Sequence, residues 1–255
     1  MNQSLVHPWL IDDTFTRPDW TKNESRPKNL MWLDKNENCD PIYQDFLKQL
    51  LHEIDHSSLF TYPNAFPVYS KLAKYCSVNI NQMILTPGSD GVIRYVFQAF
   101  VKPGDVVIHT SPTFAMYPVY CKMFGAKSIH VEYEKTDELP KLDLNHMYRL
   151  ISYEKPKLIC LPVPDSPTGS IIELDSVIEL LNLTEKTGTI VLIDEAYFEF
   201  YKKTCVDLIH KYNHLVIART FAKGWGLAGL RAGYALSNSS LIASFHKLRP
   251  MYEIN

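Results

Sequence analysis

Short apolar runs alternate along this chain with longer amphipathic stretches, and no other feature constrains the fold as strongly. The runs are rich in β-branched residues and bounded by turn formers; they lie at residues 82–86, 105–110, 127–133, 156–163, 189–195 and 215–220. Helices are expected around them, at residues 40–56, 67–77, 90–101, 114–124, 141–153 and 172–186. This order predicts an α/β fold, a three-layer α/β/α sandwich in which helices cover both faces of a mostly parallel sheet.

Composition and charge indicate which kinds of partner and cellular location to expect. The 255 residues are enough to bury a real core, and 46% hydrophobic with 21% charged residues is ordinary for a globular protein. A net charge of −2 gives no reason to expect nucleic acid or an anionic membrane as partner. Neither a secretory signal nor a membrane-spanning stretch is visible, so we expect a cytoplasmic protein. The cysteines form no CxxC pair, so we expect neither a disulfide framework nor a metal site; they are Cys39, Cys76, Cys121, Cys160 and Cys205.

Two expected strands end in loops that suit ligand binding, because open α/β sheets bind ligands beyond the carboxyl ends of their strands. The sequence "TPGSDG" follows the first strand and places Gly88, Ser89 and Asp90 at the start of a helix. Backbone amides, a hydroxyl and a helix N-terminus are the ingredients of a phosphate cradle, although helix capping explains the same residues. The loop 164–169 also follows a strand, and an ordinary turn explains it equally well.

Two further strand ends carry ionisable groups. Asp194 closes an otherwise apolar strand, where a carboxylate is costly unless it meets a cation or hydrogen-bond donors; the alternative is that it caps the next turn. Tyr197 can present its phenol to the same ligand. Lys223 stands alone in the mostly apolar stretch 219–236, "RTFAKGWGLAGLRAGYAL". A lysine for an aldehyde, an aspartate for a ring nitrogen and a helix N-terminus for a phosphate form the set that pyridoxal phosphate needs.

The sequence resembles the histidinol-phosphate aminotransferase branch of the fold type I pyridoxal-phosphate enzymes. The matching stretches keep the family's order and spacing over most of the chain: "LDKNEN" (33–38), "YP" (62–63), "GSD" (88–90), "SPTFAMY" (111–117), "SPTG" (166–169), "DEAYFEF" (194–200) and "AKGWGLAGLRAGY" (222–234). The resemblance implies a pyridoxal 5'-phosphate-binding large domain over residues 31–248. An N-terminal arm at 1–30 precedes it, and the start of a hinge at 249–255 follows it.

The resemblance also implies roles for single residues. Lys223 would bond the cofactor and move a proton at the substrate, Asp194 would pair with the pyridine nitrogen, and Tyr197 would hydrogen-bond the phenolic oxygen. Phe114 would stack on the ring. Tyr62 would reach the phosphate of the neighbouring subunit, which implies a homodimer. The phosphate of the same subunit would be bound by Gly88, Ser89, Asp90, Thr220 and Arg231.

Three features depart from the family pattern. Ser166 replaces the usual asparagine that donates to the cofactor's phenolic oxygen, and serine is shorter. Ala222 replaces a serine that often contributes to phosphate binding. The last residues, "KLRPMYEIN", resemble the hinge into the family's small domain, which normally supplies the arginine for the substrate carboxylate. We therefore expect the chain to lack that domain, as a short or truncated form or as one piece of a split enzyme.

The leading hypothesis for function is a pyridoxal-phosphate-dependent aminotransferase. It would transfer an amino group between an amino acid or an amino-phosphate resembling histidinol phosphate and a 2-oxo acid. Two alternatives stay open on the sequence. One is a decarboxylase of a phosphorylated amino acid, and the other is a truncated, catalytically impaired protein that binds the cofactor or a partner.

Overall fold

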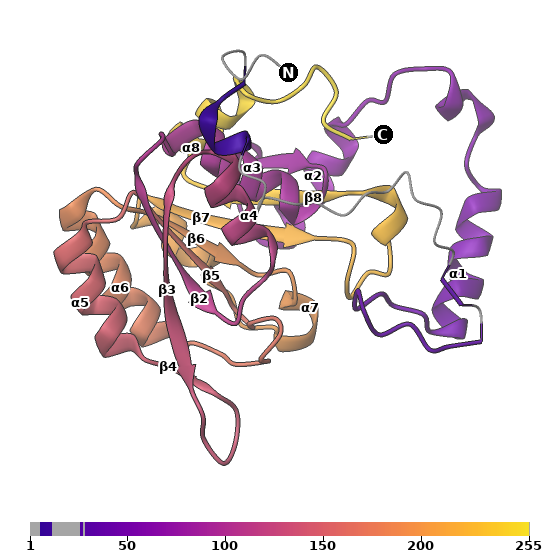
Figure 1. The fold of residues 1–255 in the computed structure, drawn as a ribbon. Helices are drawn as coiled ribbons and strands as arrows, with labels where there is room; N and C mark the ends of the chain where they lie inside the picture. The colour runs from indigo at the N-terminus through magenta and orange to yellow at the C-terminus, as the bar shows by residue number, and fades with distance from the viewer. Residues whose placement is uncertain (1–5, 12–25, 28, 255) are drawn as a thin grey trace.

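A mixed sheet of eight strands organises the chain, and the computed structural model describes residues 6–11, 26–27 and 29–254 (Figure 1). The strand order is β1-β8-β7-β6-β5-β2-β3-β4. The strands are β1 (Met83–Thr86), β2 (Val106–Ser111), β3 (Lys127–Glu134), β4 (Lys141–Leu142), β5 (Leu158–Pro162), β6 (Ile190–Asp194), β7 (Leu215–Thr220) and β8 (Gly233–Ser237). The arm expected over residues 1–30 lies largely outside the described residues and stays a prediction, as does the hinge.

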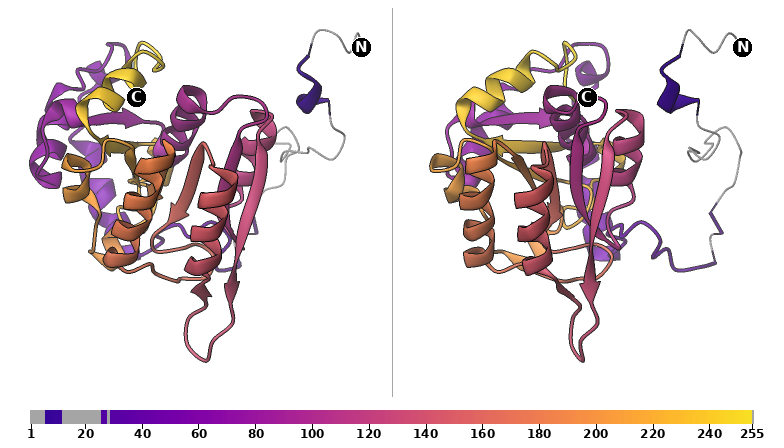
Figure 2. Two further views of the ribbon diagram at one scale, coloured as in Figure 1. Left: turned by 90° about the vertical axis from the view of Figure 1, so that its left-hand side faces the viewer. Right: turned by 60° about the vertical axis from the view of Figure 1, so that its left-hand side comes forward.

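Helices cover both faces of this sheet (Figure 2). The α-helices are α1 (Pro41–His52), α2 (Phe66–Cys76), α3 (Gly88–Phe100), α4 (Met116–Met123), α5 (Leu144–Glu154), α6 (Leu174–Thr187), α7 (Phe198–Tyr201) and α8 (Ser239–His246). Short 3₁₀ helices occupy Pro8–Leu10, His56–Leu59, Ile80–Gln82, Val206–His210 and Ala228–Leu230. None of the helices described here is long and apolar enough to cross a bilayer.

The prediction of a three-layer sandwich is confirmed, because the buried hydrophobic residues form two clusters, one on each face of the sheet. On β6, Val191 and Ile193 join the core with α2, α5 and α6, whereas Ile190 and Leu192 join the core with α3, α4 and α8. This alternation follows from the two-residue period of a strand, and both faces are apolar because both are covered. Strands β3, β2, β5, β6 and β7 run parallel, while β4 and β8 run antiparallel to their neighbours.

Local sequence signals set the ends of the helices. Asp40 caps α1 by accepting from the Ile42 amide, and Pro41 follows at the first helical position, where its missing N–H costs nothing. Asn238 caps α8 through the amides of Ser240 and Leu241. At the other end, Gly188 stops α6 in the left-handed conformation at φ +69°.

The structure departs from the sequence prediction at several elements. Strand β8 and helices α7 and α8 were not expected, and the helix expected at 141–153 begins at residue 144, after the short strand β4. Strand β8 escaped notice because it begins with Gly233, and glycine weakens the pattern of a strand. The glycine is required there because a Cβ atom would lie 2.5 Å from the carbonyl carbon of Gly88 and 2.6 Å from the Arg219 oxygen.

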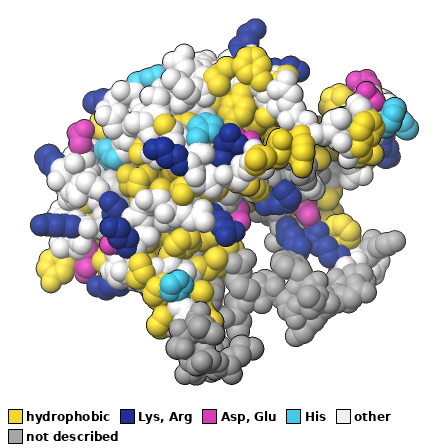
Figure 3. All heavy atoms as spheres, turned by 90° about the horizontal axis from the view of Figure 1, so that it is seen from above, with side chains coloured by type: hydrophobic (Ala, Val, Ile, Leu, Met, Phe, Trp, Pro, Cys, Tyr) yellow, Lys and Arg dark blue, Asp and Glu magenta, His cyan; other side chains and the backbone are white. Residues whose placement is uncertain are grey.

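Helix α1 projects away from the sheet, and none of its residues is buried (Figure 1). Seen from above, hydrophobic side chains are exposed on this projecting part of the molecule (Figure 3). The exposed large hydrophobic residues of α1 and of the segment after it, which we call the α1 surface, are Ile42, Phe46, Leu50, Leu51, Ile54, Leu59, Phe60 and Tyr62. Single-chain proteins rarely expose apolar surfaces of this extent.

Candidate active site

A cavity of about 140 Å³ opens where β5, β6 and β7 end. Nine of the eleven residues singled out in the sequence line it: Ser89, Asp90, Phe114, Ser166, Asp194, Tyr197, Thr220, Lys223 and Arg231. Pro162, Pro164, Ala196 and Ala222 complete the lining. Within the described part of the chain, no group of three or more His, Cys, Asp or Glu side chains could hold a metal ion.

Asp194 is a buried carboxylate at the floor of this cavity, with only 4% of the residue exposed. Its Oδ2 accepts a hydrogen bond from the Tyr117 hydroxyl at 3.0 Å, and its Oδ1 accepts from the Ala196 amide at 3.0 Å. Burial raises the pKa of Asp194 to about 6, although both hydrogen bonds oppose that rise. No ion pair among the described residues involves Asp194, so the carboxylate suits a ligand that brings a protonated nitrogen.

Tyr117 was not anticipated from the sequence. Burial raises the pKa of its phenol well above the usual value, so the hydroxyl keeps its proton and donates to Asp194. Its ring also meets Phe114 edge-on, with the centroids 5.7 Å apart. The signal was present in "SPTFAMY", since a tyrosine three residues after Phe114 can turn its side chain toward the same site.

The start of α3 forms an anion cradle. The residue before the helix is Pro87, which provides no side-chain cap, so the first amides of the helix have no side-chain acceptor. Gly88 has φ +71°, and a Cβ there would lie 3.1 Å from Nη2 of Arg231. The guanidinium therefore occupies the space that a side chain at residue 88 would need. Helix amides and a guanidinium together suit a phosphate.

Asp90 and Thr220 complete the polar lining beside this cradle. Asp90 Oδ1 is buried and has no partner among the described residues, so a ligand that donates a hydrogen bond would satisfy it. The Thr220 hydroxyl accepts from the Ala222 amide at 3.1 Å. Ala222 contributes its backbone here and, as the sequence indicates, has no hydroxyl to offer a phosphate.

Lys223 reaches the cavity from the loop that follows β7, residues 221–227, which we call the lysine loop. Its Nζ donates to the Lys35 carbonyl at 2.5 Å and lies 5.8 Å from the centre of the Tyr197 ring. The loop closes on itself, because the Leu227 amide donates to the Phe221 oxygen at 2.9 Å.

The phenol of Tyr197 faces Lys223 across the cavity. Its oxygen accepts from Asn36 Nδ2 at 2.8 Å, and its hydroxyl donates to Ser166 Oγ at 3.5 Å, so Ser166 lies beside Tyr197 in the cavity. Asn36 was not singled out, although it lies in the quoted stretch "LDKNEN". Its contact with Tyr197 joins residues far apart in the chain, which spacing alone does not reveal.

Tyr62 and Gly88 are the two expected site residues that do not line the cavity, and of these only Tyr62 lies away from it. Tyr62 is 77% exposed and stacks on Tyr252, with the ring centroids 4.1 Å apart. The sequence assigned Tyr62 to the site of a neighbouring subunit, and its exposure leaves it accessible to one.

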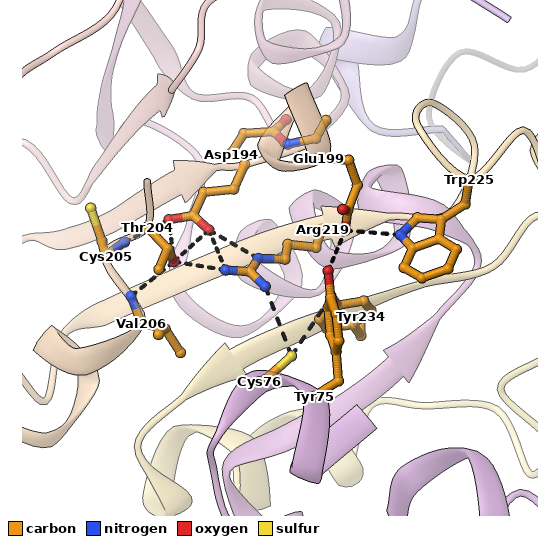
Figure 4. A network of polar contacts seen from close by, with 12 residues as sticks. Tyr75, Cys76, Asp194, Glu199, Thr204, Cys205, Val206, Arg219, Trp225 and Tyr234 are labelled. Atoms are coloured by element: carbon orange, nitrogen blue, oxygen red, sulfur yellow. Dashed lines mark hydrogen bonds and ion pairs between the residues drawn. The ribbon is translucent and has the colours of Figure 1, made fainter. Parts of the chain in front are cut away.

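Arg219 belongs to a buried polar network that was also not anticipated, and Figure 4 shows its contacts with Thr204 and Cys76. Arg219 and Glu195 are 2.9 Å apart, with 4% and 1% of their side chains exposed. Burial lowers the pKa of Arg219, but Glu195, Tyr234 and Cys76 together outweigh burial, so the pKa is raised. Thr204 donates to Glu195 and accepts from Arg219 at 2.7 Å, and the Arg219 guanidinium lies 3.6 Å from the centre of the Phe198 ring. Because Glu195 follows Asp194 and Arg219 precedes Thr220, this pair joins the ends of β6 and β7.

Comparison with known proteins defines the class. The family described as "Aminotransferase class I and II" matches residues 28–252, and the chain belongs to this family. It is 36% identical over 225 residues to the histidinol-phosphate aminotransferase of Thermoanaerobacter pseudethanolicus, covering 88% of this chain and 62% of that protein. It is 31% identical to the histidinol-phosphate aminotransferase of Clostridium novyi, with the same coverage. The chain thus spans about three fifths of the length of these relatives.

Solved structures of other proteins have the same fold as this chain. The histidinol-phosphate aminotransferase of Sinorhizobium meliloti, solved in complex with pyridoxal-5'-phosphate, superposes with a TM-score of 0.73 at 23% identity, over 86% of this chain and 59% of that one. The L-threonine-O-3-phosphate decarboxylase of Porphyromonas gingivalis superposes with a TM-score of 0.65 at 21% identity, over 86% of this chain and 64% of that one. At these identities the likeness concerns the fold, so it does not separate transamination from decarboxylation.

Proposed function

We propose that this chain is the cofactor domain of a pyridoxal-phosphate-dependent aminotransferase. One observation carries the proposal: Asp194 is a buried carboxylate that forms no ion pair with any described residue, and it shares a cavity with Lys223 and with the anion cradle of Arg231. A carboxylate, an amine and an anion site match the ring nitrogen, the aldehyde and the phosphate of pyridoxal 5'-phosphate.

Each residue has a definite task in this proposal. Bound pyridoxal phosphate supplies an electron sink for bonds at the Cα atom of an amino acid. Asp194 would hold the proton on the ring nitrogen, and Tyr117 would orient Asp194. Lys223 would hold the cofactor and move the proton at Cα. Tyr197 and Ser166 donate to the phenolic oxygen, and the first amides of α3 with Arg231 and Thr220 bind the phosphate.

The proposed substrates are an amino acid or an amino-phosphate resembling histidinol phosphate as donor and a 2-oxo acid as acceptor. The names of the curated relatives support this choice, and four fifths or more of this chain aligns with them. Because the chain spans only part of their length, the substrate pair belongs to the proposal.

We also propose a homodimer. Tyr62 is exposed and lies outside the cavity of its own chain, and it belongs to the α1 surface, whose other members are apolar. A second copy that covers the α1 surface would bring each Tyr62 toward the partner's cradle, which is the composite site that the family resemblance implies.

Chemical trapping tests the proposal at Lys223. Pyridoxal phosphate is added to the purified chain, the product is reduced with borohydride, and peptides are mapped by mass spectrometry. We expect the label on Lys223, and we expect Lys223→Ala to lose it. Lys202→Ala is the matched control and should keep the label, because Lys202 does not line the cavity. Label on other lysines with Lys223 unmodified would refute the proposal.

A further inference from the structure

The segment after β6 faces in two directions. Asp194 and Tyr197 line the cavity. In contrast, Glu195 contacts Arg219 at the end of β7, and Glu199 contacts Trp225 beyond it, as Figure 4 shows for Glu199 and Trp225. One face of this segment therefore meets the proposed cofactor site, and the other face meets the chain that carries Lys223.

Glu199, in the short helix α7, is the acceptor at the centre of the second face. Its Oε1 accepts from the Tyr75 hydroxyl at 2.8 Å and from Trp225 Nε1 at 2.9 Å, and its Oε2 pairs with Lys202 at 2.9 Å. The side chain is 17% exposed. Burial raises the pKa of Glu199, but these three donors outweigh it and the pKa is lowered, so the carboxylate is charged near neutral pH.

The contact between Glu199 and the lysine loop is also steric. Gly224 lies between Lys223 and Trp225, and a Cβ on it would lie 2.5 Å from Cβ of Glu199. The loop thus packs directly on the base of the Glu199 side chain. An ion pair with Lys202 alone would require neither this close approach nor a donor at residue 225.

Other contacts also hold the lysine loop. At its start, the Phe221 amide donates to the Ala232 oxygen at 3.0 Å and the Phe221 ring packs against Tyr234. From the N-terminal segment, Asn38 donates to the Gly224 oxygen at 3.3 Å and the Tyr43 hydroxyl donates to the Trp225 oxygen. Glu199 connects the loop to β6 and, through Tyr75, to α2.

We propose that Glu199 is a positioning residue for Lys223: through Trp225 and the contact at Gly224 it fixes the lysine loop so that Nζ is directed into the cavity. The inference rests on the proposed function only in what Lys223 does there. Its first readout therefore needs no cofactor.

The first experiment measures amide hydrogen exchange of the lysine loop in the cofactor-free chain. Glu199→Ala should speed exchange at Gly226 and Leu227 about tenfold, the effect of losing a hydrogen bond to a charged group. Trp225→Phe should act in the same direction, because it removes the donor and keeps an aromatic ring. Glu199→Gln should stay near wild type, since its amide oxygen still accepts from both donors. Lys202→Ala is the control and should change nothing at these amides.

A glycine pair tests the steric contact. Gly224→Ala should speed exchange in the loop, whereas Gly229→Ala should not, because a Cβ at Gly229 meets nothing within 4 Å. Both residues have ordinary backbone angles for alanine, since neither has a positive φ. The pair therefore differs in the contact with Glu199 and not in backbone strain.

The second experiment follows the rate at which pyridoxal phosphate attaches to Lys223. Glu199→Ala should slow attachment about tenfold, and Glu199→Gln should restore the rate. Wild-type exchange in Glu199→Ala would overturn the inference, and so would faster exchange with an unchanged attachment rate. If the wild-type chain attaches no cofactor, the proposed function fails, while the exchange data still decide whether Glu199 holds the loop.

Discussion

Asp194 carries an energetic cost that the cofactor-free chain cannot avoid. Its pKa rises from 3.8 to about 6 because its charged form is buried. Below about pH 4 the group is protonated in both the folded and the unfolded chain. Between about pH 4 and 6 the folded chain retains the proton and the unfolded chain releases it, so stability falls as pH rises through this window. The shift corresponds to a loss on the order of 3 kcal/mol.

The first prediction concerns this pH dependence. Asp194→Asn cannot ionise, so its free energy of unfolding should lack that loss. We expect the stability of wild type relative to the variant to fall by roughly 3 kcal/mol between pH 4 and pH 7. Urea unfolding of the cofactor-free proteins at several pH values measures this difference in the free energy of unfolding. A constant difference between the two proteins over this range would show that Asp194 does not titrate as described.

The second prediction concerns Tyr117. Tyr117→Phe removes the only side-chain donor described for Asp194, so burial is less opposed and the pKa of Asp194 should rise by about one to two further units. The pH range over which the free energy of unfolding falls should then extend to higher pH. Tyr95→Phe is the control, because its buried hydroxyl has no partner among the described residues. An unchanged window in Tyr117→Phe would contradict this role.

At the scale of single elements, the sequence predicted the strands and helices whose patterns are local. Runs such as 190–194 are apolar on both faces and were recognised, and the parallel sheet follows from their alternation with helices. Strand β8 was missed because Gly233 and the small residues beside it resemble a loop. The reason for that glycine lies in Gly88 and Arg219, which are remote in sequence.

The candidate site likewise contains residues that the sequence predicted and residues that it did not. Asp194 and Lys223 were predicted because Asp194 ends one strand and Lys223 follows another, and the carboxyl ends of parallel strands meet. Glu195 and Arg219 were not, because their pairing depends on the register of β6 against β7, which fixes Asp194 opposite Ala218. The spacing of residues along the chain does not reveal how β6 is aligned with β7.

The third prediction tests the close approach at β8. Gly233→Ala should destabilise the fold by about 1–3 kcal/mol, because a Cβ would strike the backbone of Gly88 and Arg219. It should also displace the start of α3 and weaken phosphate binding. Gly229→Ala is the matched control and should be close to neutral. Chemical unfolding measures the free energy of unfolding of both variants. Equal values for Gly233→Ala and Gly229→Ala would show that β8 can shift to accommodate the Cβ atom without loss of stability.

At the scale of the whole molecule, the α1 surface bears on the fourth prediction. Ile42 and Phe46 lie one turn apart on α1, and both are exposed. Ile42→Glu combined with Phe46→Glu should weaken self-association at least tenfold by sedimentation. Lys48→Glu also changes the net charge by −2 and should leave association unchanged, because it replaces an exposed charged residue. Monomeric wild-type protein at all concentrations would refute a dimer through this surface.

Strand β8 also has a consequence for how the protein is made. It is the only neighbour of β1 in the described sheet, and Thr86 pairs with Gly233. A ribosome adds about 5–20 residues per second, so the roughly 150 residues between these partners take roughly 8 to 30 s to appear. Throughout that interval β1 has emerged without a partner, and β7, once made, exposes the edge that β8 will cover. Nascent chains are therefore most open to wrong pairing, and most in need of chaperones, until residue 237 leaves the ribosome.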